Sequence, residues 1–160
     1  MERMNELGFY TLAGAPRSPR DLIDEVQQGE AMGLGSAFIS ERFNIKEAAT
    51  LSGAVGAVST EIGIATAATN HNTRHPMVTA AYAMTMHRLT DGRFSLGFGR
   101  GIGPMFDRFG LPRITTAQIE DFVGLMRRIW KGEVVVGHDG PAGRYPLLAM
   151  PGYAEHIPMT

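Results

Sequence analysis

The sequence predicts an α/β protein built on one parallel sheet, and three observations support this fold class. Short apolar segments alternate with helical segments along most of the chain. The run Ile62–Ala68 is apolar on both faces, which is typical of a parallel strand covered on both sides. Polar clusters follow several of the apolar runs, as expected for the functional edge of such a sheet. Strands and helices in this alternation form right-handed βαβ units.

The four predicted strands are short runs rich in apolar residues, and each is followed by glycine or polar residues. They are Leu7–Leu12, Ser36–Ser40, Ile62–Ala68 and Phe94–Phe98. The fourth strand runs directly into a glycine-rich segment that begins at Gly99.

A helix is predicted after each strand, because residues that suit a helix N-terminus stand at the right places. They are Ser18-Pro19 for the first helix, Asn44 with Glu47 for the second, His75-Pro76 for the third and Thr115 with Gln118 for the fourth. These helices are expected to end at Gly33, about Ser59, the Asp91-Gly92 turn and Gly132.

The character of the chain changes after Gly132. Residues 134–145 predict a β-hairpin, and Ile157-Pro158-Met159 has the pattern of a strand that is only begun. We therefore expect a single domain over residues 1–160, with four βα units in residues 1–131. Residues 132–160 are expected to hold the hairpin, as an insertion region, and a truncated fifth strand.

Four βα units in 160 residues are compatible with two architectures. One is a small, open, doubly wound sheet. The other is half of a (β/α)8 TIM barrel, which typically needs about 250 residues. A strict G-x-G-x-x-G is absent, because Ile102 stands where the third glycine should follow Gly97 and Gly99. The glycine spacing therefore weakens the case for a nucleotide-binding open sheet.

Composition excludes several classes of function. The chain carries 15 Lys+Arg against 16 Asp+Glu, so the basic excess that a nucleic-acid binder needs is missing. Hydrophobic residues make up 44%, yet no apolar run approaches the ~20 residues of a membrane span. There is no cysteine, hence no disulfide, thiolate nucleophile or Cys-based zinc site. With no apolar leader at the N-terminus, we expect a cytoplasmic protein that binds neither nucleic acid nor membrane.

The polar clusters that could carry chemistry all follow predicted strands, at the edge where parallel α/β proteins place their active sites. They are Glu41-Arg42, Thr69–His75 and Arg100. Solvated loops are the simpler alternative for each cluster. His71 and His75 lack the third ligand that a metal site needs, and His75-Pro76 also suits a helix N-terminus. Gly99-Arg100-Gly101 fits either a tight turn or a close approach of backbone N–H groups to a ligand.

One segment carries a family resemblance. Thr69-Asn-His-Asn-Thr-Arg-His-Pro76 resembles the T-N-x-x-T-R-H-P signature of the luciferase-like family, and most closely that of its deazaflavin (coenzyme F420)-dependent oxidoreductases. Ser40–Phe43, Leu89–Phe94 and Leu96–Gly101 also resemble family segments. The resemblance extends from Leu7 to about Tyr145, and it favours the barrel over the open sheet.

The resemblance implies a (β/α)8 barrel about twice this length, with an FMN or deazaflavin ring at the mouth formed by the C-terminal strand ends. A non-prolyl cis peptide behind the ring would match Ala67-Ala68, and Thr69 and Asn70 follow it. Arg100 and Gly101 match positions beside the cofactor. Glu41 matches an acidic position near the ring edge, and Arg42 stands where several relatives carry a proton-donating His. We expect Glu41 and Arg42 to be catalytic. The residues expected to bind the cofactor are Glu41, Ala67, Ala68, Thr69, Asn70, Arg100 and Gly101.

The activity implied by the resemblance is hydride transfer between reduced coenzyme F420, or alternatively FMN, and a small organic substrate. Ile102 replaces the Glu found in one sugar-phosphate branch, which argues against that substrate. The alternative is a truncated, non-catalytic half-barrel that binds cofactor or pairs with another chain. Because four strands leave an uncovered face and open edges, we expect either a homo-oligomer or a missing C-terminal half.

Overall fold

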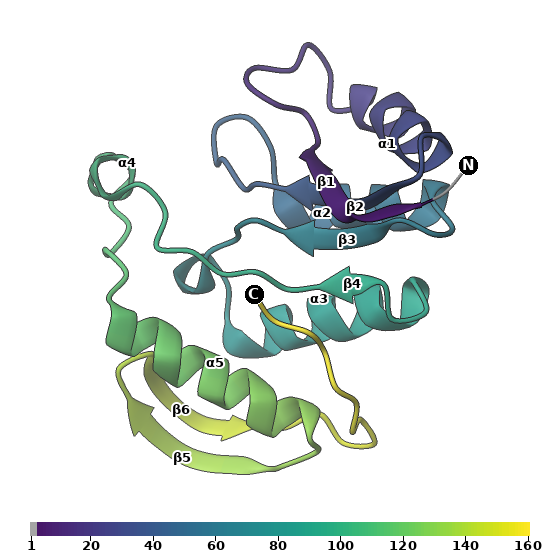
Figure 1. The fold of residues 1–160 in the computed structure, drawn as a ribbon. Coiled ribbons are helices and arrows are strands. Elements are labelled where there is room, and N and C mark those ends of the chain that lie inside the picture. Colours follow the sequence, from purple (N-terminus) through teal and green to yellow (C-terminus); the bar gives the residue numbers. More distant parts are fainter. Residues whose placement is uncertain (1–2) are drawn as a thin grey trace.

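The computed structural model describes residues 3–160 and contains a sheet of four parallel strands (Figure 1). The strands lie in sequence order and are β1 (Met4–Tyr10), β2 (Leu34–Ile39), β3 (Gly63–Thr66) and β4 (Phe94–Ser95). Each neighbouring pair is parallel, so the chain must cross over between consecutive strands. The sheet therefore has the topology of a partial (β/α)8 barrel.

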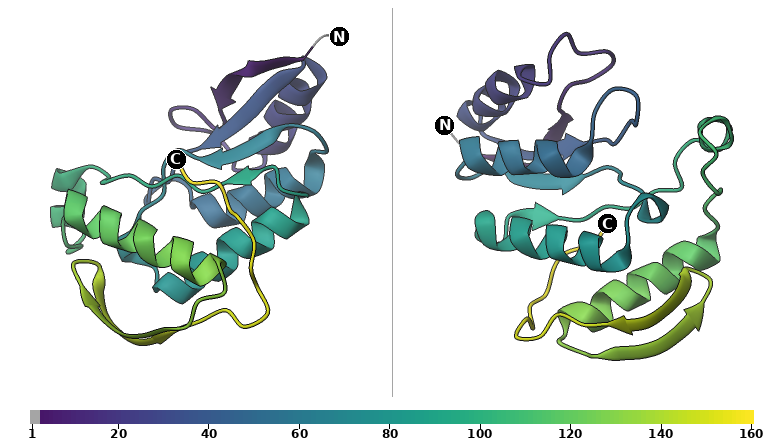
Figure 2. Two further views of the ribbon diagram at one scale, coloured as in Figure 1. Left: turned by 60° about the horizontal axis from the view of Figure 1, so that its bottom comes forward. Right: turned by 180° about the vertical axis from the view of Figure 1, so that it is seen from behind.

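The crossovers are helical, and the helices cover the outer side of the sheet. They are α1 (Asp21–Ala31), α2 (Ala48–Val58) and α3 (Pro76–Leu89), and after β4 the chain forms α4 (Gly103–Arg108) and α5 (Thr116–Trp130). A short 3-10 turn, His71–Thr73, precedes α3. From behind, α2 and α3 lie in front of the strands (Figure 2, right). In Figure 1 the opposite face of the sheet has no helix over it.

The register aligns residues of neighbouring strands in rows across the sheet. Rows that point to the helices are buried, and rows that point to the other face are more exposed. Ala37, Ile64 and Phe94 are aligned across the strands and are buried beneath the helices. The next row along starts with Tyr10, which is paired in register with Phe38 and remains 55% exposed. The apolar core thus lies between sheet and helices, and the inner face of the partial barrel is open.

Beyond α5 the chain makes an antiparallel hairpin of β5 (Val135–Gly140) and β6 (Gly143–Leu148). Val135 and Leu148 are buried in the core cluster with α5. The carboxylate of Asp121 on α5 accepts the backbone N–H of Ala142 at 2.8 Å and lies 3.1 Å from the His138 ring. The hairpin is therefore docked on the helix by both apolar and polar contacts.

The last residues of the chain lie alongside β4. The N–H of Leu96 donates to the carbonyl of Pro158, and the N–H of Thr160 donates back to Leu96. Leu96 and Met159 form a parallel bridge, which is the beginning of a fifth strand. In Figure 1 this terminal segment passes in front of α3.

The capping residues predicted for two helices are confirmed. The His75 ring accepts the N–H of Met77, and Thr115 forms a reciprocal capping box with Gln118. Both caps use residues within three positions of the helix start, so they can be identified without knowledge of the tertiary fold.

Two predicted helix starts are wrong by a few residues. The first helix begins at Asp21, because Pro19 and Arg20 form a preceding turn in which the Ser18 hydroxyl accepts the Arg20 N–H. The second begins after Glu47 rather than after Asn44. The Glu47 carboxylate itself caps α2, accepting the N–H groups of Ala49 and Thr50.

Candidate functional site

The C-terminal ends of β2, β3 and β4 converge at one end of the sheet, and backbone hydrogen bonds hold their exits together. The N–H of Glu41 donates to the carbonyl of Ala68 at 3.2 Å. Thr69 bridges to Phe98, and the amide of Asn70 donates to the carbonyl of Gly99 at 2.8 Å. We call this end of the partial barrel the mouth. It brings together Glu41, Ala68, Thr69 and Asn70.

A buried ionic network fixes the Glu41 side chain, which is 3% exposed. Arg74 donates through Nη2 to Glu41 Oε1 at 2.6 Å and through Nη1 to Oε2 at 3.3 Å. Nη1 also donates to the Thr69 hydroxyl at 3.0 Å, and that hydroxyl donates to Glu41. Nη2 reaches the carboxylate of Glu47 as well. One guanidinium thus joins the exits of β2 and β3 to the start of α2.

The electrostatics of this network keep its charges in place. Burial alone would lower the pKa of the Arg74 guanidinium, but the hydrogen bonds and charge of Glu41, with the charge of Glu47, raise it. Burial opposes ionisation of Glu47 too, yet its pKa is lowered by the N–H groups of Thr50 and Ala49 and by Arg74. Arg74 is therefore a permanent cation between two carboxylates.

The peptide bond Ala67-Ala68 is cis, as the family resemblance implies. It lies directly after β3, and the N–H of Ala67 donates to the carbonyl of Ile39 at 2.8 Å. The Ala68 methyl packs against the exit of β4, since a Cβ added at Gly99 would lie 3.1 Å from it.

Gly101 occupies a position that only glycine fits. Its φ is +67°, and a Cβ would lie 2.6 Å from the ring of Phe106 and 3.2 Å from the Asn70 amide nitrogen. The turn at Gly101 therefore seats the aromatic ring of α4 directly against the exit of β4.

A cavity of about 60 Å³ opens between these elements. Its lining residues are Glu41, Arg42, Phe43, Asn70, Gly101, Ile102, Met105 and Phe106. The Glu41 carboxylate, the Asn70 amide and Gly101 at this rim suit the edge of a flat heterocycle. A complete ligand pocket is usually ~300–1,000 Å³, so these residues make up part of such a site and further walls are needed to enclose a tricyclic ring.

Arg42 and Arg100 are less closely tied to the cluster. Arg42 lines the cavity, but its guanidinium donates to the carbonyl of Gly14 at 2.9 Å and the residue is exposed. Arg100 is exposed and does not line the cavity. The structure therefore brings Glu41, Arg42, Asn70 and Gly101 together around the cavity, with Ala67, Ala68 and Thr69 behind them.

The two histidines of the motif have separate roles in the fold. His75 caps α3, whereas His71 is buried and stacks on Phe122 with ring centroids 5.1 Å apart. Burial lowers the pKa of His71. Among residues 3–160, no three His, Asp or Glu side chains are grouped closely enough to hold a metal ion.

Sequence reasoning missed several residues of the mouth. Arg74 lies inside the Thr69–Pro76 motif, but its contacts with Glu41 and Glu47 form only in the tertiary structure. Lys46 is buried and donates to the carbonyls of Thr11 and Leu12, both at 2.9 Å, so it holds the exit of β1. Burial, and the charge of Arg42, lower the pKa of Lys46. Phe106 had no signal beyond its apolar character, and Phe43 was noted only as the end of the family-like segment Ser40–Phe43.

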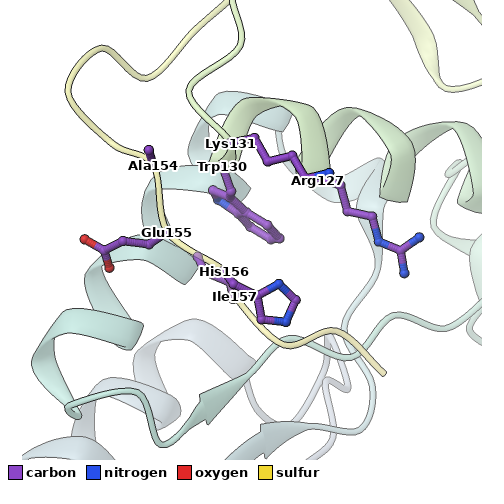
Figure 3. A pocket seen from close by; sticks show the side chains of 7 residues that line it. All are labelled: Arg127, Trp130, Lys131, Ala154, Glu155, His156 and Ile157. Carbon is purple, nitrogen blue, oxygen red and sulfur yellow. The ribbon is translucent and has the colours of Figure 1, made fainter.

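A larger hollow of about 560 Å³ lies elsewhere, between the C-terminal end of α5 and the tail (Figure 3). It is lined by Arg127, Trp130, Lys131 and residues 154–157, and the Trp130 ring projects from α5 toward the tail. None of the predicted site residues borders it, and α5 begins near the mouth and ends here (Figure 1). We therefore place the candidate site at the mouth and not in this hollow.

The family model for luciferase-like monooxygenases matches residues 5–158. The chain belongs to this family, and its fold is that of a partial luciferase-like barrel. The 5,10-methylenetetrahydromethanopterin reductase of Methanopyrus kandleri is 28% identical over 126 residues, which are 76% of this chain and 36% of the reductase. The chain therefore spans little more than a third of that relative.

Solved structures of similar fold are also about twice as long as this chain. An F420-dependent secondary alcohol dehydrogenase with a bound F420–acetone adduct superposes with a TM-score of 0.78 at 21% identity, covering 99% of this chain and 52% of the dehydrogenase. A type II Baeyer–Villiger monooxygenase from Pseudomonas putida, in complex with FMN, gives a TM-score of 0.73 at 24% identity, covering 97% and 45%. Both likenesses establish the fold, of which this chain forms about half.

In residues 3–160 we find no helix with the length and hydropathy required to cross a bilayer.

Proposed function

We propose that this chain is the N-terminal half of an oxidoreductase barrel that binds coenzyme F420 at its mouth and reduces or oxidises a small organic substrate. The observation that carries the proposal is the mouth itself: a carboxylate fixed by Arg74, the Asn70 amide and Gly101 lie around one cavity, and the Ala67-Ala68 segment adjoins it through the hydrogen bond from the Glu41 N–H to the Ala68 carbonyl. The sequence resemblance to the deazaflavin branch favours F420 over FMN. The F420-bound neighbour is consistent with this preference, and the FMN-bound neighbour keeps FMN as the alternative.

The residues of this chain would hold the ring from one side. Ala67 and Ala68 would form the surface behind the ring, and Gly101 lets the backbone approach its edge. The Glu41 carboxylate would accept a hydrogen bond from a ring N–H, and Thr69 and Asn70 would keep the loop around it in place. When bound, the ring would supply the chemistry of hydride transfer, two electrons with one proton, between cofactor and substrate.

The two residues expected to be catalytic would have electrostatic roles. Both oxygens of Glu41 are engaged by Arg74 and Thr69, so this carboxylate would orient the ring and would not shuttle a proton. Arg42 stays protonated near neutral pH and would stabilise negative charge on the ring or substrate. The proton exchanged with the substrate would therefore come from water or from another part of the complete barrel.

We also propose that residues 1–131 supply the four βα units of this barrel, and that residues 132–160 add the hairpin and begin the fifth strand. A second copy could complete the barrel only by pairing beyond the terminal segment, because Pro158 and Thr160 already bond to Leu96 beside β4. This favours completion by a C-terminal half over a symmetric pair. Light scattering tests the choice: a stable dimer of the 17.3 kDa chain would support pairing instead.

Titration with each cofactor tests the binding proposal. Purified chain is mixed with F420 or with FMN, and bound cofactor is followed by absorbance and by fluorescence anisotropy. We expect F420 to bind more tightly than FMN, and Glu41→Gln to weaken binding about tenfold, the effect of losing one charge-assisted hydrogen bond. Tight retention of FMN alone would contradict the choice of cofactor. Binding without substrate turnover would favour the non-catalytic half-barrel.

A further inference from the structure

Positive charge gathers at the mouth, although the chain as a whole has a formal net charge of -1. The four strands are parallel, so the segments that leave their C-terminal ends all lie at this edge of the sheet. In Figure 1 the loops after β1 and β2 and helix α4 lie on one side of the sheet. These four segments, residues 11–20, 40–47, 67–75 and 96–115, hold eight of the 15 Lys+Arg and three of the 16 Asp+Glu. The fold therefore produces a positive potential at the mouth.

The three acidic residues of these segments are all engaged by two of the arginines. Arg74 pairs with Glu41 and Glu47, and Arg113 pairs with Asp107. Six cations of the same segments are left without a carboxylate from the mouth. The positive potential is therefore not cancelled locally.

Arg42 and Lys46 are two of these six cations, and they belong to one loop. Lys46 is 8% exposed and donates to the carbonyls of Thr11 and Leu12, both at 2.9 Å. Burial lowers the pKa of Lys46, the charge of Arg42 lowers it further, and the charge of Glu25 opposes both effects. Because carbonyl partners are neutral, the charges of Arg42 and Lys46 repel each other, and an anion beside Arg42 would be attracted by both.

Arg42 is the cation of this pair that borders the mouth cavity. It is exposed, and among residues 3–160 its guanidinium makes one hydrogen bond, from Nη1 to the carbonyl of Gly14 at 2.9 Å. A guanidinium has five N–H donors in a planar fork, so most of them remain free. Asn70 borders the same cavity and donates one amide N–H to Gly99, which leaves its second N–H. The cavity thus has unused hydrogen-bond donors and a positive charge.

Glu41 also lines the cavity, and a free carboxylate there would repel an anion. Its side chain is 3% exposed, and Arg74 donates to both of its oxygens. The negative charge of Glu41 is therefore compensated at short range, whereas the positive charge of Arg42 is not. An anionic group beside Arg42 gains a charge-assisted hydrogen bond without facing an uncompensated carboxylate.

We propose that Arg42 is a specificity-determining residue of the mouth and that it selects a small organic substrate carrying a carboxylate. The planar guanidinium would bind the two carboxylate oxygens through parallel N–H···O bonds, which fixes the orientation of the substrate as well as its position. This inference rests on the proposed function, in which the cofactor ring occupies the mouth and the substrate lies beside it. The phosphate of the cofactor is the competing anion, and the experiment below separates the two.

Nuclear magnetic resonance titration at low salt tests the proposal with two probes of similar shape and different charge, cyclohexanecarboxylate and cyclohexanecarboxamide. The full chain is titrated with each probe, alone and in the presence of F420 or FMN. We expect the carboxylate to shift the signals of Gly14, Arg42 and the Asn70 side-chain amide, and to bind about tenfold more tightly than the carboxamide. Equal binding of the two probes overturns the proposal. Shifts confined to residues far from the mouth do so as well.

Variants identify the residue responsible. Arg42→Gln is expected to weaken binding of the carboxylate about tenfold and that of the carboxamide by less than about twofold. Arg42→Lys keeps the charge but loses the planar fork, so about a threefold loss is expected. Arg108→Gln is the matched control, because Arg108 is an exposed arginine of α4 that does not line the cavity. An unchanged dissociation constant in Arg42→Gln, or equal weakening in Arg108→Gln, refutes the assignment to Arg42.

Riboflavin and FMN separate the substrate from the cofactor, because they differ by the phosphate alone. If Arg42→Gln weakens binding of FMN but not of riboflavin, Arg42 holds the cofactor phosphate and the substrate assignment is refuted. Failure of the proposed function gives a different result. If neither F420 nor FMN binds while the carboxylate still binds and depends on Arg42, the cofactor assignment fails and the role of Arg42 stands. If the carboxylate does not bind, with or without cofactor, the role of Arg42 is refuted.

Discussion

Replacing Arg74 is the most informative single change at the mouth. In Arg74→Gln the side chain keeps much of its length but loses its charge, so Glu41 remains with a 3% exposed carboxylate and no cation beside it. Breaking a buried ion pair by removing one partner costs about 3–5 kcal/mol, because the remaining charge stays desolvated. The contact to Glu47 adds about 1 kcal/mol or less, since that carboxylate is 45% exposed.

The expected loss of stability is therefore about 3–6 kcal/mol, which corresponds to a fall in melting temperature of roughly 6–24 °C for a chain of this size. Urea denaturation followed by circular dichroism measures it. Arg144→Gln is the control, because its ion pair with Asp139 joins side chains that are 83% and 65% exposed. That variant should lose about 1 kcal/mol or less.

A double variant tests the reasoning itself. If the cost comes from an uncompensated charge, Arg74→Gln combined with Glu41→Gln should be more stable than Arg74→Gln alone, because no buried charge then lacks a partner. A double variant that loses the sum of the two single losses would refute this account. So would a loss below about 1 kcal/mol in Arg74→Gln.

Three further changes have definite expected outcomes. Gly101→Ala should cost about 1–2 kcal/mol or more in urea denaturation, because φ is +67° and the methyl would meet Phe106; unchanged stability would contradict the close approach. Burial lowers the pKa of His71 below 6.5, so stability present above that pH should fall on acidification, and His71→Phe, which keeps a ring against Phe122, should flatten the pH dependence of the melting temperature. An identical slope in wild type and variant would exclude His71 as the cause. Thr115→Ala should cost about 1 kcal/mol through loss of the α5 cap, and a calorimetric melting temperature equal to that of wild type would disprove that contribution.

Much of the architecture follows from local sequence signals. The alternation of strands and helices, the caps at His75 and Thr115 and the hairpin after Gly132 all depend on residues near one another in the chain. The family resemblance added the barrel and the position of the cis peptide at Ala67-Ala68, which no local propensity indicates.

The parts that were missed depend on contacts between distant residues. The six-residue helix α4 was not predicted, because its segment is short and its position is fixed by Phe106 against Gly101 and by rings from another loop. The sequence predicts Asn44 as the cap because Glu47 follows three residues later, as in a capping box. In the fold, the Glu47 carboxylate reaches two helix N–H groups and Arg74 at once. The role of Arg74 could be seen only after β2, β3 and α2 were brought together.

The hairpin has a consequence for how this chain tolerates change. The path leaves the body of the protein at Gly132, where a Cβ would lie 3.1 Å from the carbonyl oxygen of Tyr153, and it returns where the N–H of Glu155 bonds to Trp130 at 2.9 Å. Departure and return are thus neighbours, and Val135 and Leu148 between them belong to the core. Changes in the length of the excursion that keep these two side chains buried would leave the strand exits that carry Glu41 and Thr69 in place.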